Sequence, residues 1–156
     1  MIHIDIPSFG PVSIQHVVLD FNGTIAEDGR RVPGLGRAIA SLAGQVEFHV
    51  LTADTFGSVK KELEGIDCTL KIISEKAQDQ KKQDYVLSLG AEKTLAAGNG
   101  TNDALMLKTA RIGVAVMLKE GMAVAAMTAA DIVVRDILDL FGLLSVPKRL
   151  IAGLRT

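Results

Sequence analysis

Short apolar runs and longer segments with helical spacing alternate along most of the chain. The run Val17-Val18-Leu19 is apolar and mostly β-branched, which is typical of a strand buried on both faces of a parallel sheet. Further apolar runs predict strands at 46–51, 68–73, 94–97, 112–116 and 132–134. The segments between these runs predict helices at 33–43, 56–63, 77–89, 103–110, 122–127 and 136–144.

Strands that alternate with helices imply a parallel sheet joined by right-handed crossovers. We therefore expect an α/β fold, a doubly wound three-layer α/β/α sandwich with a mainly parallel sheet. Residues 2–6 alternate apolar and polar, which predicts a half-exposed edge strand, and residues 7–11 turn the chain back toward the central strand, which predicts a hairpin. The polar segment 25–32 predicts a small flap hairpin. Residues 147–151 either pack as a last turn or contact a neighbouring subunit, and we expect residues 1–156 to form a single domain.

Composition narrows the class of protein. Apolar residues make up 48% of the chain and charged residues 22%, which is typical of a globular protein, and a net charge of -1 gives no reason to expect nucleic acid or an anionic membrane as a partner. A lone cysteine, Cys68, fits a reducing compartment, and no apolar stretch approaches the roughly 18 residues of a membrane span, so we expect a cytoplasmic protein. A mean hydropathy of +0.30 is high for a small monomer and predicts a homo-oligomer.

Three of the predicted strands run directly into polar residues. The strand at 17–19 ends in Asp20, and the strand at 46–51 ends in Thr52-Ala53-Asp54. The strand at 94–97 runs into Gly98-Asn99-Gly100-Thr101-Asn102-Asp103. The carboxyl ends of parallel strands meet at one edge of the sheet, where open α/β sheets bind ligands. A carboxylate there could ligate a hard cation or attack a phosphoryl group, although an aspartate after a strand also caps ordinary turns. The convergence of three polar strand ends favours a ligand site.

These strand ends resemble the motifs of a known superfamily. Asp20-Phe21-Asn22-Gly23-Thr24, then Leu51-Thr52-Ala53, then a lysine, then residues 98–103 look like the four motifs of the haloacid dehalogenase-like (HAD-like) phosphohydrolases. The resemblance is closest to the phosphorylation domain of P-type ATPases and to the small soluble proteins that share it. It extends from about Val17 to Val134.

The resemblance implies a phosphohydrolase that works through an aspartyl-phosphate, with a phosphorylated small molecule as substrate. Asp20 matches the nucleophile. Thr52 matches the hydroxyl that hydrogen-bonds a phosphoryl oxygen, with the backbone N–H of Ala53 as a second donor. The family's lysine is one of Lys76, Lys81 and Lys82, and Lys82 fits best because the apolar pattern after it matches the family's helix.

The resemblance also implies a magnesium ion as cofactor. Mg²⁺ would be held by the carboxylate of Asp20, the backbone carbonyl of Asn22 and a residue of the 98–103 loop, where Asn99 and Asp103 are the candidates. Asp103 would act as a ligand directly or through a bound water, and Asn102 would contact the phosphate.

Two positions depart from the superfamily's pattern. Asn22 stands where phosphatases carry an aspartate that transfers protons, and a carboxamide cannot do so at neutral pH. Because general acid–base catalysis contributes about 10²–10⁴-fold in rate, we expect slow turnover. Asn99 stands where a magnesium-binding aspartate is common, so metal affinity should fall. Both departures motivate an alternative, a catalytically weak or inactive HAD-like protein that binds a phosphorylated ligand or partner.

Two further expectations concern parts of the chain outside the motifs. Residues 21–51 leave room for a flap and one helix, so we expect a capless protein without the nucleotide-binding domain of P-type ATPases. His3, His16 and His49 lie on predicted strands but not at their polar ends. We therefore expect packed or surface imidazoles rather than ligands.

Overall fold

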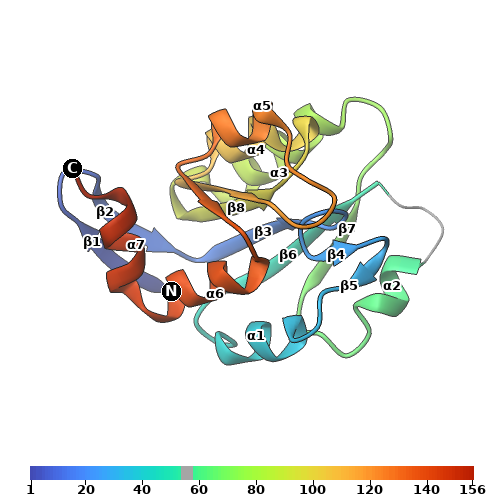
Figure 1. Cartoon of the computed structure of the whole chain (residues 1–156), viewed down its shortest axis with the longest axis horizontal. Helices are drawn as coiled ribbons and strands as arrows, with labels where there is room; N and C mark the ends of the chain where they lie inside the picture. The colour runs from blue at the N-terminus through green and yellow to red at the C-terminus, as the bar shows by residue number, and fades with distance from the viewer. Residues whose placement is uncertain (54–57) are drawn as a thin grey trace.

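The computed structural model describes residues 1–53 and 58–156. Its centre is a six-stranded sheet in which all neighbouring strands are parallel, in the order β10-β9-β8-β3-β6-β7 (Figure 1). This arrangement confirms the predicted α/β fold. The strands of this sheet are β3 (His16–Asp20), β6 (Glu47–Thr52), β7 (Thr69–Ile72), β8 (Thr94–Gly98), β9 (Ile112–Val116) and β10 (Ile132–Val134).

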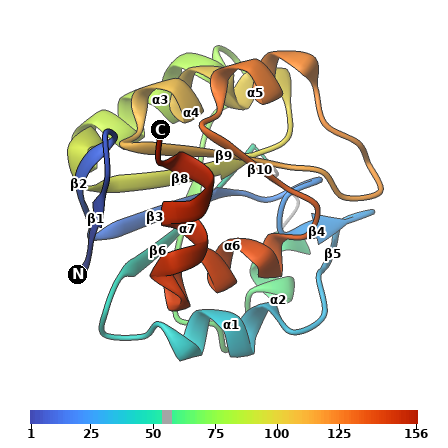
Figure 2. The ribbon, with the colours of Figure 1, turned by 60° about the vertical axis from the view of Figure 1, so that its left-hand side comes forward.

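Helices cover both faces of the sheet and complete the three layers (Figures 1 and 2). One face carries α1 (Leu35–Ser41), α2 (Ser58–Glu62) and α6 (Ile137–Ser145). The other face carries α3 (Gln78–Leu89), α4 (Ala104–Thr109) and α5 (Val124–Ala129). The short 3-10 helices η1 (Ala91–Lys93) and η2 (Thr101–Asp103) flank β8.

The central strand β3 is buried along its whole length. Val17 and Leu19 belong to the apolar cluster beneath α1 and α6, whereas Val18 belongs to the cluster beneath α3, α4 and α5. Fully burying one such side chain contributes about 1.5–3 kcal/mol to stability. Two apolar layers therefore hold β3, and with it Asp20, in a fixed place.

The first strand pairs differently from our expectation. β1 (Ile2–Ile6) and β2 (Gly10–Ile14) form the predicted antiparallel hairpin, but they make a two-stranded sheet of their own instead of an edge of the main sheet. Helix α7 (Pro147–Leu154) packs on β1, so the end of the chain contacts its own hairpin. The hairpin, α7 and both termini lie at one end of the molecule (Figure 1).

Several helix bounds differ from the prediction. The helix expected from Pro33 begins at Leu35, because Gly34 before it has a left-handed backbone with φ of 89°. The helix expected at 122–127 runs two residues later, at Val124–Ala129. The helix expected from Phe56 is seen at Ser58–Glu62, and Phe56 itself lies outside the described residues. Within 1–53 and 58–156, no helix is both long enough and apolar enough to cross a membrane.

Candidate active site

Asp20 occupies the last position of β3, between the ends of two neighbouring strands. β3 pairs with β6 on one side and with β8 on the other, so the crossover connections on the two sides of β3 diverge at this point. Asp20 is aligned with Leu51, one residue before Thr52, while Leu19 is aligned with Ala97, one residue before Gly98. The three polar strand ends thus meet at one edge of the sheet, at a position where α/β sheets bind ligands.

A lysine from α3 joins two carboxylates at this edge. The Lys82 Nζ donates to Asp20 Oδ1 at 2.5 Å and to Asp103 Oδ1 at 2.6 Å. The exposed fraction of Lys82 is 1% and that of Asp103 is 0%, so these charges lie inside the protein. Buried charges persist only where they are paired in good geometry, and this cluster satisfies that condition.

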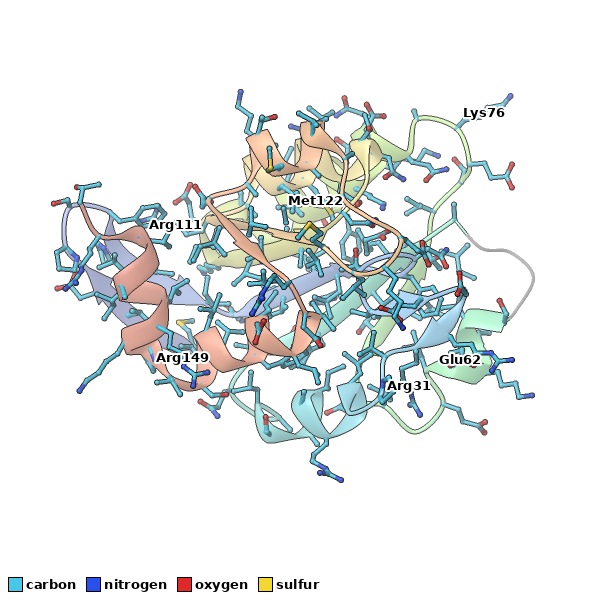
Figure 3. All side chains as sticks on the ribbon, in the orientation of Figure 1. Arg31, Glu62, Lys76, Arg111, Met122 and Arg149 are labelled. Atoms are coloured by element: carbon cyan, nitrogen blue, oxygen red, sulfur yellow. The ribbon has the colours of Figure 1, made fainter. Side chains whose placement is uncertain are left out.

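The other two candidate lysines lie elsewhere. Lys81 is exposed and donates to the hydroxyl of Ser74. Lys76 is exposed in the loop before α3, and its side chain points away from the molecule (Figure 3). Of the three candidate lysines, the structure therefore brings Lys82 to Asp20, whereas Lys76 and Lys81 lie elsewhere.

Burial and charge shift the protonation equilibria of this cluster. Burial, followed by the negative charge of Asp103, raises the pKa of Asp20 to about 7, although Lys82 acts in the opposite direction. Burial alone would lower the pKa of Lys82, but the two carboxylates raise it above its usual value. Two carboxylates share one ammonium group, so a further cation would relieve the excess of negative charge.

Asp103 also fixes the loop after β8. Its Oδ2 accepts hydrogen bonds from the backbone N–H of Asn99 at 3.0 Å and of Gly100 at 2.8 Å. Gly98 makes room for this carboxylate, because a Cβ there would lie 2.4 Å from Asp103 Cγ. Both oxygens of Asp103 are thus engaged, one by Lys82 and one by its own loop.

The turn after Asp20 packs directly on the same loop. The Thr24 hydroxyl is fully buried and lies 3.3 Å from both Asp20 Oδ2 and Asn99 Oδ1, while Asn99 Nδ2 donates to the backbone oxygen of Gly121 at 3.0 Å. Gly23 has φ of 75°, and a Cβ there would lie 2.2 Å from Asn99 Nδ2. We gave Thr24 no role from the sequence, although its place four residues after Asp20 in the first motif was a signal.

The remaining predicted residues occupy different surroundings. Asn22 is exposed, and its backbone bridges to Ala26 at the start of the flap hairpin, which is formed by β4 (Ala26–Glu27) and β5 (Arg30–Arg31). Asn102 Nδ2 donates to Gln78 Oε1 on α3 at 2.8 Å. Thr52 is buried as the last residue of β6. Asp54, the last residue of the predicted polar turn, lies outside the described residues.

The oxygen atoms at this edge fit a hard cation. The carboxylate of Asp20 and the amide oxygen of Asn99 face the same buried hydroxyl, and the backbone carbonyl of Asn22 belongs to the adjacent turn. Carboxylate, amide and carbonyl oxygens are the ligands that Mg²⁺ accepts, and the excess negative charge favours a cation. Because both oxygens of Asp103 are already bonded, Asp103 is better suited to holding Lys82 and the loop than to direct ligation.

Solved structures share this architecture. A putative HAD family hydrolase from Streptomyces avermitilis superposes with a TM-score of 0.65 at 23% identity, covering 85% of this chain and 84% of that one. The protein has the HAD-like fold. Another structure with the HAD-like fold is 3-deoxy-D-manno-octulosonate 8-phosphate phosphatase from Moraxella catarrhalis, which was solved with a magnesium ion, a phosphate ion and its sugar. It superposes with a TM-score of 0.64 at 14% identity, covering 89% of this chain and 92% of that one.

The HAD-like fold is also found in a transport ATPase. A zinc-transporting PIB-type ATPase superposes with a TM-score of 0.62 at 24% identity, over 79% of this chain and 20% of that one. These superpositions confirm, at the level of the fold, the resemblance drawn from the four motifs.

Sequence comparison gives one curated relative. An uncharacterized protein from Methanocaldococcus jannaschii is 44% identical over 64 residues, which make up 41% of this chain and 69% of the relative. The chain belongs to the same family as that archaeal protein. No family model matches the sequence.

Proposed function

We propose that this protein is a magnesium-dependent phosphohydrolase that forms an aspartyl-phosphate on Asp20. The observation that carries the proposal is the buried Lys82 ammonium held between Asp20 and Asp103 at the end of the central strand. In this proposal Asp20 is the nucleophile, Lys82 supplies a fixed positive charge, and the neighbouring oxygen atoms bind a cation. The magnesium and phosphate ions in the Moraxella phosphatase, which has the same fold, support the proposal.

The first step transfers the phosphoryl group to the protein. An oxygen of the Asp20 carboxylate forms a bond to phosphorus, and the bond between phosphorus and the leaving oxygen of the substrate breaks. Lys82 holds Asp20 in place and offsets the negative charge of the phosphoryl oxygens, and the Thr52 hydroxyl and the Ala53 N–H donate to them. Mg²⁺, held by Asp20, Asn22 and Asn99, would supply the remaining positive charge.

The second step is expected to limit turnover. A water oxygen attacks phosphorus, and the phosphorus–oxygen bond to Asp20 breaks, which releases inorganic phosphate. The attacking water must lose a proton, and the exposed carboxamide of Asn22 cannot accept one at neutral pH. Without general acid–base catalysis, the rate falls by about 10²–10⁴-fold, so the aspartyl-phosphate should persist.

The substrate class that we propose is supported by phosphatases of the same fold, since the Moraxella enzyme was solved with a phosphate ion and its sugar. Residues 21–51 hold the flap hairpin and α1, which leaves the edge of the sheet without a large covering segment in that part of the chain. We propose a phosphorylated small molecule as substrate, turned over in the cytoplasm by a single domain.

Self-association stays part of the proposal. Val124 and Met127 on α5 are apolar but 70% and 44% exposed, which supports the homo-oligomer predicted from the mean hydropathy. Light scattering after size-exclusion chromatography tests this, and a monomer at micromolar concentration would contradict it.

A second candidate function is binding of a phosphorylated ligand or partner without useful turnover. Two observations favour it: the carboxamide of Asn22, and the amide of Asn99 held by the carbonyl of Gly121 in place of a carboxylate. Such a protein would still bind a phosphate analogue with magnesium, but it would not release phosphate.

Hydrolysis of an aryl phosphate with and without Mg²⁺, compared between wild type and Asp20→Asn, tests the proposal. Metal-dependent turnover that the variant lacks supports the phosphohydrolase. Absence of turnover, with a thermal shift on adding beryllium fluoride and Mg²⁺, supports the binding function instead. Absence of both responses contradicts either function.

A further inference from the structure

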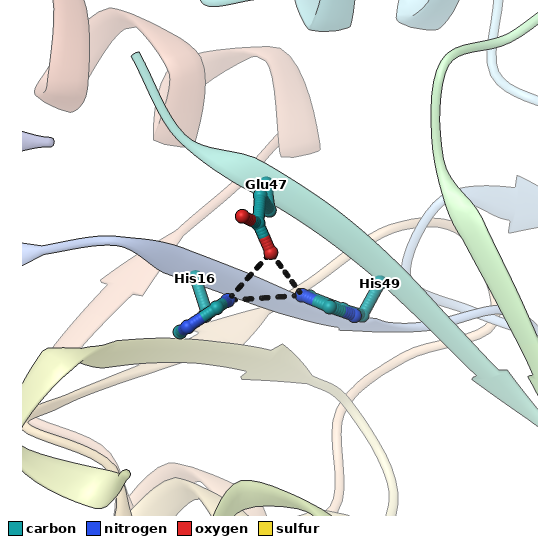
Figure 4. A group of neighbouring side chains, drawn as sticks. All are labelled: His16, Glu47 and His49. Carbon is teal, nitrogen blue, oxygen red and sulfur yellow. Dashed lines mark hydrogen bonds and ion pairs between the residues drawn. The ribbon is translucent and has the colours of Figure 1, made fainter. Parts of the chain in front are cut away.

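Two histidines and a glutamate meet at the end of the sheet remote from Asp20. His16 and Glu47 are the first residues of the neighbouring strands β3 and β6 and are aligned with each other, and His49 follows two residues along β6. Residues two apart on a strand point to the same face, so the sheet places all three side chains together. Figure 4 shows the three side chains converging between the two strands.

The distances between their polar atoms match a metal site. His16 Nδ1 lies 3.1 Å from His49 Nε2 and 3.3 Å from Glu47 Oε2, and His49 Nε2 lies 3.9 Å from that oxygen. Around a tetrahedral zinc ion with bonds of about 2.0–2.2 Å, ligand atoms stand roughly 3.4 Å apart. The three atoms therefore form one face of a coordination tetrahedron.

A fourth residue orients His49 for this role. The His49 Nδ1 is hydrogen-bonded to the hydroxyl of Tyr85 on α3 at 3.0 Å, which leaves the His49 Nε2 facing His16 and Glu47. Histidine ligands of metals usually bind an outer partner through the second ring nitrogen in this way.

The two imidazoles of this group are buried, whereas the glutamate is largely exposed to solvent. The side chains of His16 and His49 are 11% and 7% exposed, whereas that of Glu47 is 65% exposed. Glu47 also lines an open pocket of about 470 Å³. Glu47 is therefore the member of the group that solvent reaches, and the two imidazoles lie buried beside it.

We propose that His16 Nδ1, His49 Nε2 and Glu47 Oε2 bind a divalent transition-metal ion of the zinc class, with a water molecule in the fourth position. Imidazole nitrogen suits Zn²⁺, whereas Mg²⁺ prefers an all-oxygen shell. This site is separate from the one at Asp20 and does not depend on the proposed phosphohydrolase activity.

Zinc binding by the full chain, without a histidine tag and freed of metal by a chelator, tests the site. Titration calorimetry with Zn²⁺ should give one equivalent, and Co²⁺ should give the visible absorption of tetrahedral coordination. Glu47→Gln and His49→Gln should each weaken binding at least tenfold, and Tyr85→Phe about tenfold. His3→Gln is the matched control, because His3 is exposed and bonds only Ser13 among the described side chains.

Glu47→Gln keeps the test decisive even where a buried substitution harms folding, since its side chain is largely exposed. Its unfolding temperature in chelator should equal that of the wild type. The site is refuted if Glu47→Gln binds zinc as tightly as the wild type, if His3→Gln weakens binding to the same extent, or if millimolar Mg²⁺ displaces the zinc. Preserved binding by His3→Gln, with loss in Glu47→Gln, supports it.

Discussion

Lys82 Nζ lies 2.5 Å from Asp20 Oδ1, although 62 positions separate the two residues in the chain. The contact forms because α3 packs beside β8 and brings its one buried lysine to the end of β3. A buried pair of this kind is a weak source of stability, but loss of one partner leaves the other charge unpaired in the interior. The contact therefore matters for both folding and chemistry.

Lys82→Met should lower the free energy of unfolding by about 3 kcal/mol at pH 8, because it leaves Asp20 and Asp103 buried without their cation. The exposed neighbour offers the control, since Lys81→Met should change stability by less than about 0.5 kcal/mol. Urea unfolding monitored by circular dichroism measures both variants. Equal losses in the two would contradict the importance of the buried contact.

The raised pKa of Asp20 predicts a pH-dependent stability. With a folded value of about 7 and an ordinary value of 3.8, the folded state binds more protons than the unfolded state between these limits. The free energy of unfolding should thus fall as pH rises from about 4 to 7 through this group. When measured in chelator, Asp20→Asn should remove this fall in the free energy of unfolding with pH, whereas the exposed control Asp79→Asn should retain it.

Asn22→Asp should speed the release of phosphate from the aspartyl-phosphate by about 10²-fold, because a carboxylate at this exposed place can accept a proton from water. Phosphate release under steady-state conditions measures the change. Asn22→Ala is the control and should give no gain. If the aspartate variant is no faster than the alanine variant, our account of this position is wrong.

Gly23→Ala should destabilise the protein more than Gly29→Ala. Both glycines have similar positive φ values, 75° and 74°, so the left-handed backbone costs each alanine about 1–2 kcal/mol. Only at Gly23 would the new Cβ also collide with Asn99, whereas no atom of the described residues lies within 4 Å of a Cβ at Gly29. Thermal unfolding compares the pair, and similar losses would show that the turn can move away from Asn99.

The sequence pattern was sufficient for the middle of the central sheet because β3, β8 and β9 are buried along their whole length and are rich in apolar residues. It was insufficient for β1, since alternation from Ile2 to Ile6 identifies a buried face but not the partner strand. The hairpin therefore formed a sheet of its own beneath α7. A period of two residues carries no information on which element covers the apolar side.

The site at Asp20 was predictable in part because its motifs lie at strand ends, where topology brings them together. The choice of Lys82 rested on the apolar pattern of the helix after it, and α3 does place this lysine at Asp20. The partner of Asn102 on α3 was not predictable, because it depends on how η2 and α3 pack. The group of His16, Glu47 and His49 depends on the register of β3 and β6, and only the spacing of Glu47 and His49 was visible beforehand.

The position of the two chain ends has a practical consequence. Met1 and Thr156 both lie near the hairpin and α7, at the end of the sheet away from Asp20 (Figure 1). A linker fused to either residue would leave the polar strand ends facing free solution. Protein tethered to a solid support through one end should accordingly keep whatever turnover it has when dissolved.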